Sequence, residues 1–261
     1  MENNITPFFS VIISIFQEDD VILIKSLNSI INQTFTDFEL IIVDDNPKRK
    51  HIPIQKDSRI KILKNDSNLG LTKSLNKAVK ISRGMFIVRQ DADDYSALNR
   101  LEKTYKFIVK LDKKSQLRLV YSSPFLINKK VKPNIYLKSF FNEEILRYKN
   151  FLCHGCLVIS SEILKDILYD EDFKFAQDFD LYNRLLDLEY KITFDQNNLS
   201  YFLNDLPDRV SRKFYYQQKQ FYYRVLKRNN HSLFTISLFE RLRIDILLDF
   251  YIILCKKVRK K

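Results

Sequence analysis

Three aspartates lie within four residues shortly after a short apolar run. Residues 85–88 read Met-Phe-Ile-Val, and Asp91, Asp93 and Asp94 follow them. A short unbroken apolar run is typical of a strand that is buried on both faces. Carboxylates this close together repel one another unless a cation neutralises them. Mg²⁺ and Mn²⁺ take oxygen ligands from one or two carboxylates and from phosphates. The Asp-x-Asp pattern therefore predicts a metal and diphosphate site, with a solvated acidic turn as the alternative.

A second pair of acids, Asp44 and Asp45, ends an earlier apolar segment, residues 39–43. Apolar and β-branched runs predict strands, and helical spacing of apolar residues predicts helices. The expected strands cover residues 8–16, 39–43, 60–63, 85–88, 117–122 and 156–160. The expected helices cover residues 21–31, 71–82, 96–111 (capped by Ser96) and 161–168, and a further helix begins near Asp178.

Strands that alternate with helices imply an α/β fold with a mostly parallel sheet. Ligands of such sheets bind beyond the carboxyl ends of the strands. We therefore expect all five aspartates to lie on one rim. The chain has only three glycines, Gly70, Gly84 and Gly155, and they are far apart. Since a Rossmann fingerprint or a P-loop needs clustered glycines, a metal has to take the place of backbone amides if phosphates bind here.

The composition is that of a folded protein: 45% of the 261 residues are hydrophobic and 29% are charged. Three cysteines fit a reducing cytosol. Cys153 and Cys156 lack the second pair that a structural zinc site needs. Residues 1–7 have no signal-peptide pattern, and no apolar run approaches the roughly 20 residues that cross a bilayer. We expect a cytoplasmic location.

The net charge of +12 is concentrated at the C-terminus, where residues 209–261 hold fourteen Lys and Arg against three acids. We therefore predict a catalytic domain over residues 1–208 and a basic, aromatic-rich helical extension over residues 209–261. Residues 237–261 have an amphipathic helical pattern with a basic end, which suits an anionic membrane surface. Packing against the catalytic domain or against a second copy of the chain, and nucleic-acid binding, remain the alternatives.

An ordered set of short motifs resembles the family 2 glycosyltransferases, which have the GT-A fold. The resemblance covers residues 8–205. It depends on the segments Gln33-Thr34-Phe35, Phe38 to Asp45, Asn68-Leu69-Gly70, Arg83-Gly84, Asp91-Ala92-Asp93-Asp94, His154-Gly155 and Ala176-Gln177-Asp178.

The resemblance assigns roles to individual residues. It implies that Asp45 binds the nucleotide base, that Asp91 faces the ribose, and that Asp93 binds Mn²⁺ or Mg²⁺ at the diphosphate. It implies that Asp178 is the general base, whereas the residues alone also allow a plain helix cap. His154 is either an acceptor-side residue, as the resemblance suggests, or a structural histidine.

The activity that the resemblance implies is transfer of a sugar, with inversion, from a nucleotide diphosphate, expected to be UDP. The expected acceptor is a saccharide or a lipid-linked saccharide in cell-surface polysaccharide synthesis. Arg212 is a candidate clamp for the diphosphate, together with Arg209 and Lys213. A sugar-nucleotidyltransferase and a nucleic-acid-binding protein are the alternatives. The first would need a glycine-rich N-terminal signature, which residues 9–17 lack, and the second leaves the acidic strand ends unexplained.

Overall fold

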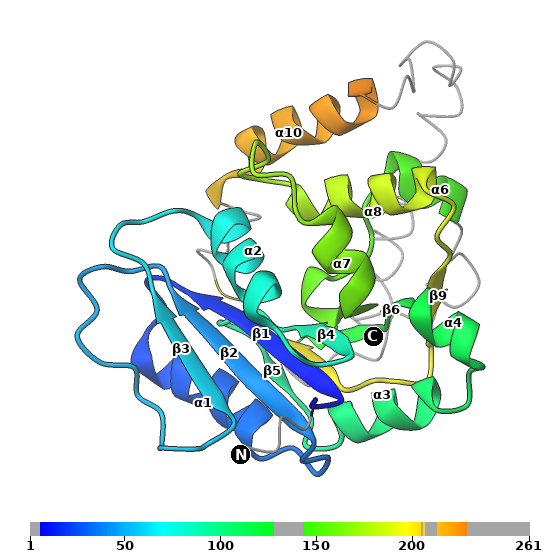
Figure 1. The fold of residues 1–261 in the computed structure, drawn as a ribbon. Helices are drawn as coiled ribbons and strands as arrows, with labels where there is room; N and C mark the ends of the chain where they lie inside the picture. The colour runs from blue at the N-terminus through cyan, green and yellow to red at the C-terminus, as the bar shows by residue number, and fades with distance from the viewer. Residues whose placement is uncertain (1–5, 128–142, 205, 207–212, 229–261) are drawn as a thin grey trace, which may run out of the picture.

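A seven-stranded sheet forms the centre of the protein in the computed structural model, which describes residues 6–127, 143–204, 206 and 213–228 (Figure 1). The spatial order of its strands is β3-β2-β1-β4-β8-β6-β9. Their bounds are β1 Phe9–Ile15, β2 Phe38–Asp44, β3 Ile60–Lys64, β4 Phe86–Arg89, β6 Val120–Ser122, β8 Val158–Ser160 and β9 Ile192–Phe194. Strand β8 runs antiparallel to β4 and β6, and the other neighbouring pairs are parallel. The prediction of a mostly parallel α/β sheet is confirmed.

Helices cover both faces of this sheet. Helices α1 (Asp20–Ile31) and α3 (Arg100–Ile108) pack on one face, and α2 (Leu71–Ile81), α7 (Ser161–Ile167) and α8 (Gln177–Asp187) pack on the other. Strands β1 and β2 contribute alternate side chains to the two cores, as Ile12 and Ile13 illustrate. Because β1 and β2 are buried on both sides, their sequences are mostly apolar rather than alternating.

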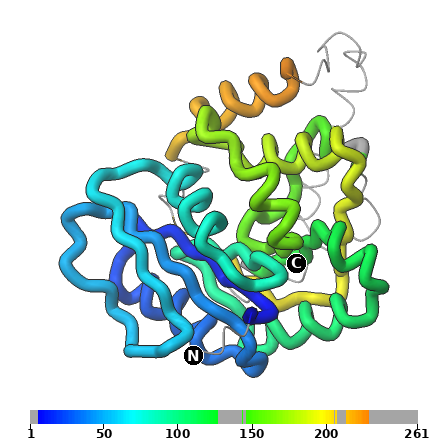
Figure 2. The backbone as a smooth tube through the Cα atoms, in the orientation of Figure 1, coloured from blue at the N-terminus to red at the C-terminus, as the bar shows by residue number. Residues whose placement is uncertain are grey.

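The chain builds the two halves of the molecule in sequence, as the backbone trace shows (Figure 2). The first half contains β1 to β4, and the second half is richer in helices. The second half also contributes to a small sheet of order β5-β10-β7, made by Tyr95–Ser96, Tyr201–Leu203 and Phe125–Ile127. The remaining described elements are α4 (Lys113–Leu117), α6 (Glu143–Tyr148), the short 3₁₀ helix η1 (His154–Cys156) and α10 (Tyr215–Arg228).

Two local predictions are wrong. Ser96 does not cap a helix but lies in β5, because its backbone pairs with Tyr201. Residues 113–117 form a helix, which Asp112 caps, so the expected strand begins only at Val120. In α1 the exposed side chains include Val21 and Ile24, and the buried stripe is Leu23, Leu27 and Ile30.

The basic extension lies only partly within the described residues. Its segment Tyr215–Arg228 is helical and packs against α8. Residues 237–261 and the boundary at 208/209 lie outside the described residues, so the membrane helix and the domain division stay predictions. Within the described part, no helix is both long and apolar enough to cross a membrane.

Candidate active site

A large cleft of about 2170 Å³ opens between the carboxyl ends of the central strands and the helical half of the protein. Five of the six predicted site residues line it, namely Asp45, Asp91, Asp93, His154 and Asp178. The sixth, Arg212, lies outside the described residues, but the neighbouring Lys213 lines the cleft. The fold thus gathers acids from distant parts of the chain around one space.

The expectation that all five strand-end aspartates share one rim is wrong for two of them. The Asp44 side chain is buried and forms ion pairs with Arg49 at 3.6 Å and with Lys64 at 3.6 Å. Asp94 is also buried and accepts hydrogen bonds from Tyr201 Oη at 3.1 Å and from the Asn204 backbone N–H at 2.9 Å. Both carboxylates hold neighbouring segments in place, and neither lines the cleft.

Asp45 fixes the loop that precedes α2. Its Oδ1 accepts hydrogen bonds from Asn65 Nδ2 at 2.7 Å and from the Leu69 N–H at 2.8 Å, and its Oδ2 accepts one from the Gly70 N–H at 2.8 Å. Gly70 has φ +84°, a left-handed conformation that glycine adopts without a steric penalty. Since a carboxylate has about four lone-pair positions, Oδ2 can still accept a hydrogen bond from a ligand in the cleft.

Asp91 is paired with an arginine that the sequence reading did not single out. Arg89 Nη2 donates to Asp91 Oδ1 at 2.6 Å, and the Arg89 side chain is almost fully buried. Arg89 also lines the cleft, yet its Nε and Nη1 are buried and have no hydrogen-bond partner among the residues that the structure describes. An unsatisfied buried guanidinium nitrogen is costly, so these atoms point to a bound water or a substrate oxygen beside Asp91.

Asp93 faces the same cleft as Glu18. Burial raises the pKa of Glu18, and the negative charge of Asp93 adds to that rise. Among the residues that the structure describes, no group of three or more His, Cys, Asp or Glu side chains is placed to hold a metal ion. Mg²⁺ commonly needs only one or two protein carboxylates when phosphate oxygens and water complete its shell. Asp93, with Glu18 beside the same space, fits such an ion.

Asp178 lies in the first turn of α8, as predicted. Its Oδ1 accepts from the Phe179 N–H at 2.9 Å and its Oδ2 accepts from Asn150 Nδ2 at 2.8 Å. Burial raises the pKa of Asp178 above its ordinary value, and these two hydrogen bonds oppose the rise. A carboxylate with a raised pKa is a stronger proton acceptor, which suits a general base.

His154 lines the cleft from η1 but is nearly buried. Its Nε2 lies 2.8 Å from Tyr169 Oη. Burial, reinforced by the nearby positive charge of Arg89, lowers the pKa of His154 to about 3. The imidazole is therefore neutral at physiological pH and can only exchange hydrogen bonds with a ligand.

The position of η1 depends on a close approach of backbone to side chain. A Cβ on Gly155 would lie 1.9 Å from Tyr201 Oη. The same hydroxyl accepts from the Asp91 N–H at 3.1 Å and donates to Asp94. Gly155 thus lets Tyr201 hold the strand end that carries the acidic motif.

Comparison with known proteins shows which family model and which relatives this chain matches. The family model described as glycosyl transferase family 2 matches residues 10–168. The chain is 34% identical over 238 residues to the uncharacterized glycosyltransferase MJ1057 of Methanocaldococcus jannaschii, with 85% of this chain and 79% of that protein covered. It is 31% identical to the O-antigen biosynthesis glycosyltransferase WbnJ of Escherichia coli, with 83% and 88% covered.

The fold is also similar to a solved structure. Residues 1–349 of S. aureus TarS match with a TM-score of 0.62 and 21% identity, over 84% of this chain and 65% of that structure. The chain therefore spans slightly less than two thirds of that structure. The same TarS fragment has been solved in complex with UDP and with UDP-GlcNAc.

Proposed function

The chain belongs to glycosyl transferase family 2 and has the GT-A fold, and we propose that it is a metal-dependent, inverting enzyme that uses a UDP-sugar. The observation that carries this proposal is that Asp178 and Asp93 line one cleft. Transfer needs a proton acceptor for the attacking hydroxyl and a place for the diphosphate at the same centre. Family membership also favours sugar transfer over nucleotidyl transfer and over nucleic-acid binding.

In this proposal the donor lies along the carboxyl ends of β2 and β4. Asp45 accepts a hydrogen bond from the nucleotide base, and Asp91 receives the ribose side while Arg89 holds its carboxylate. Asp93 would hold Mn²⁺ or Mg²⁺, and the ion would supply positive charge beside the diphosphate. The UDP and UDP-GlcNAc complexes of TarS support a nucleotide-sugar donor.

Asp178 then accepts the proton of the acceptor hydroxyl. The hydroxyl oxygen forms a bond to the anomeric carbon, and the bond from that carbon to the diphosphate oxygen breaks, with its electron pair remaining on the diphosphate. Attack on the face opposite the leaving group inverts the anomeric configuration. The oxocarbenium-like transition state corresponds to that of glycoside hydrolysis, with a sugar hydroxyl in place of water.

The acceptor in this proposal is a saccharide or a lipid-linked saccharide used for cell-surface polysaccharide. The name of the similar protein WbnJ, an O-antigen biosynthesis enzyme, supports this class. Such a role fits a cytoplasmic enzyme that associates with the inner face of the membrane. We assign that association to residues 237–261, and it remains a prediction.

A screen of nucleotide sugars tests the proposal. Thermal stabilisation and slow donor hydrolysis are measured for UDP-, GDP- and dTDP-sugars, each with Mn²⁺, with Mg²⁺ and with EDTA. We expect one UDP-sugar to stabilise and to be hydrolysed only when metal is present. If no nucleotide sugar stabilises the protein, the proposed donor class is wrong. If hydrolysis is equally fast in EDTA, the proposed metal requirement is wrong.

A further inference from the structure

One wall of the cleft is built by α10, and the donor chemistry above does not use it. Tyr215, Gln218, Lys219 and Tyr222 of this helix line the cleft. Residues three, four and seven positions apart lie on one helical face. The helix therefore presents a continuous surface of two phenol rings, an amide and a cation to the cleft.

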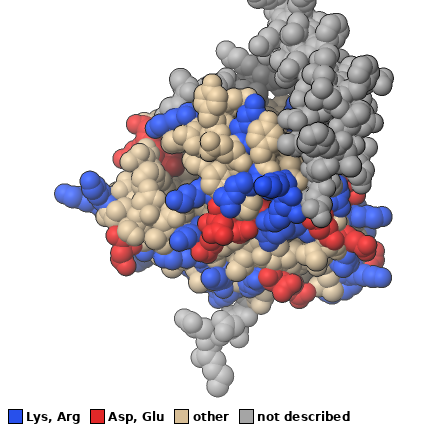
Figure 3. Space-filling model, turned by 90° about the horizontal axis from the view of Figure 1, so that it is seen from above, with Lys and Arg blue, Asp and Glu red and all other residues tan. Residues whose placement is uncertain are grey.

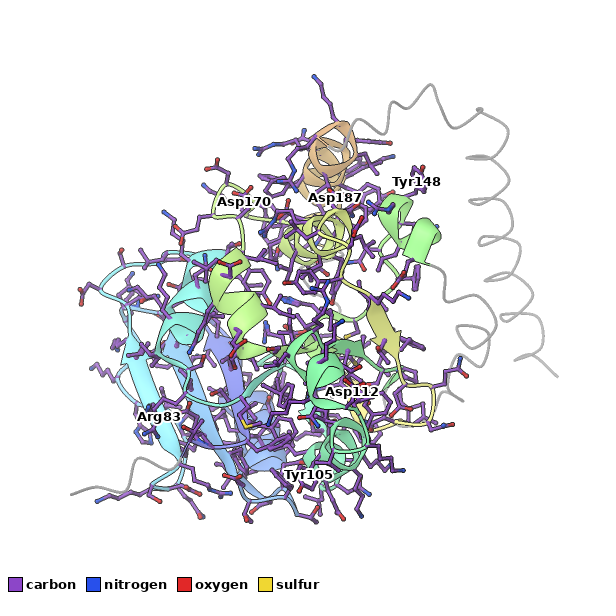
Figure 4. The ribbon with its side chains drawn as sticks, turned by 45° about the vertical axis from the view of Figure 1, so that its right-hand side comes forward. Arg83, Tyr105, Asp112, Tyr148, Asp170 and Asp187 are labelled. Atoms are coloured by element: carbon purple, nitrogen blue, oxygen red, sulfur yellow. The ribbon has the colours of Figure 1, made fainter. Side chains whose placement is uncertain are left out.

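This wall is held in place next to the catalytic carboxylate. The Tyr222 ring stacks on the ring of Phe179, with centroids 4.2 Å apart and planes 5° from parallel. Phe179 directly follows Asp178. The Tyr222 hydroxyl also donates to the Tyr148 carbonyl oxygen, and Arg228 pairs with Asp180 of α8 and with Asp170. Tyr148 and Asp170, which are labelled in Figure 4, belong to segments just below α10 in that view. A ligand on α10 is thus positioned relative to the proposed base.

The side of the cleft next to α10 differs in charge from the cleft floor, which is the part lined by Glu18, Asp91 and Asp93. Lys213, Lys219, Lys174 and Lys149 line the cleft, and the last two belong to segments that contact α10. The Phe175 ring, next to Lys174, lies 5.8 Å from the ring of Phe221 in α10, and Tyr148, which accepts the hydrogen bond from Tyr222, precedes Lys149. Glu171, Asp172 and the proposed base Asp178 are the cleft-lining acids on this side among the described residues, and Glu171 accepts a hydrogen bond from Asn76.

The face of the molecule on which α10 lies also carries further Lys and Arg side chains, gathered next to a smaller acidic group (Figure 3). The floor of the cleft, by contrast, is lined by Glu18, Asp91 and Asp93. A divalent cation would suit the floor, whereas negatively charged groups would be attracted to the lysine side.

The cleft has room for a second substrate beside the donor. Its volume of about 2170 Å³ exceeds the roughly 300–1,000 Å³ of a typical small-molecule pocket. We propose that α10 forms the acceptor-binding wall and that the acceptor is a saccharide bearing phosphate or carboxylate groups. Lys213 and Lys219 attract the anionic group, and Tyr215 and Tyr222 offer rings to the sugar. This inference rests on the proposed function, because it assumes that a sugar acceptor enters the cleft.

A charge reversal on α10 with a matched control tests the inference. Lys219→Glu changes a cleft-lining residue, and Lys227→Glu makes the same change at an exposed position of the same helix that does not line the cleft. Three tetrasaccharides serve as probes. One is neutral maltotetraose, one is maltotetraose with a terminal phosphate, and one alternates glucuronate with N-acetylglucosamine. Binding is titrated with UDP and Mn²⁺ present.

We expect at least one anionic probe to bind about tenfold more tightly than the neutral probe at low salt, with the difference shrinking as salt increases. Lys219→Glu should reduce that affinity about tenfold, and Lys227→Glu should leave it unchanged. The two anionic probes distinguish phosphate from carboxylate. Equal affinity for all three probes, or equal effects of the two variants, would overturn the inference.

Two further measurements distinguish this inference from the proposed function and from a role of the lysines in membrane binding. UDP binding is titrated first without oligosaccharide, so failure to bind UDP counts against the proposed function, whereas UDP binding without charge preference counts against the acceptor class alone. Sedimentation with lipid vesicles, with and without phosphatidylglycerol, measures whether the protein binds an anionic membrane surface. If Lys219→Glu weakens vesicle binding but not oligosaccharide binding, the lysines serve a lipid surface and the acceptor assignment is wrong.

Discussion

Replacing Asp178 with asparagine should nearly abolish turnover while leaving the fold intact. Asparagine has the same shape but cannot accept a proton from the acceptor hydroxyl. General base catalysis contributes about 100- to 10,000-fold to rate, so kcat should fall by that factor. UDP binding should be unchanged, because the proposed nucleotide contacts lie just beyond the carboxyl ends of β2 and β4.

The effect of this substitution on stability follows from two opposing contributions. The wild-type carboxylate accepts hydrogen bonds from Phe179 N–H and Asn150 Nδ2, and an amide group can replace only one of these oxygens. Loss of one hydrogen bond costs about 1 kcal/mol. Against this, the raised pKa of Asp178 means that the ionised form is disfavoured in the folded state, so above the unfolded pKa the charge lowers stability and its removal restores it. We expect Tm to change by less than about 4 °C.

The assay for this prediction couples UDP release to a phosphatase, and differential scanning calorimetry reports Tm. Asp172→Asn is the matched control, because it makes the same change at an exposed carboxylate lining the same cleft. The control should retain turnover. A folded Asp178→Asn variant that keeps more than about a tenth of wild-type kcat would refute the assignment of the base.

Three further predictions concern the surroundings of the site. Asn150→Ala removes a hydrogen bond that favours the ionised form of Asp178, so the pKa of Asp178 should rise and the acid limb of the kcat/KM profile should move to higher pH; an unmoved limb would argue against Asp178 as the titrating base. Gly155→Ala places a Cβ 1.9 Å from Tyr201 Oη, which should cost about 2–3 kcal/mol in urea unfolding, and a loss below 1 kcal/mol would show that the two segments separate easily. The pKa of His154 is lowered to about 3, so the unfolded chain binds more protons between that pH and its own pKa of about 6.5. Stability should therefore fall more steeply with acidification in the wild type than in His154→Gln, and parallel urea midpoints would contradict this.

Much of the sheet could be predicted because buried strands leave a direct trace in the sequence. The segments 8–16, 39–43 and 85–88 are mostly apolar, and they became β1, β2 and β4, buried on both faces. Residues 117–119 misled the prediction, because Leu117 ends the short helix α4 and β6 begins only at Val120. Serine is a residue type that often caps helices. The backbone of Ser96 instead pairs with that of Tyr201, more than 100 residues away, so Ser96 lies in a strand.

The acidic residues of the cleft were predictable from motif order, whereas their neighbours were not. Asp44 and Asp45 are adjacent aspartates with different surroundings. Successive side chains of a strand point to opposite sides, so Asp44 forms ion pairs with Arg49 and Lys64, whereas Asp45 lines the cleft. Asn150 is part of no motif and contacts Asp178 across 28 positions of sequence. Arg89 lies between the apolar residues 85–88 and the acidic residues that begin at Asp91. A cation at the end of a buried strand and next to acids was a signal that could have identified it.

The most direct test of the central claim is a crystal structure of the protein with UDP and Mn²⁺. We expect uracil against Asp45, the metal ion at Asp93, and the β-phosphate turned toward the part of the cleft that Asp178 lines. Nucleotide bound elsewhere on the protein, or a diphosphate separated from Asp178 by the cleft wall, would contradict it.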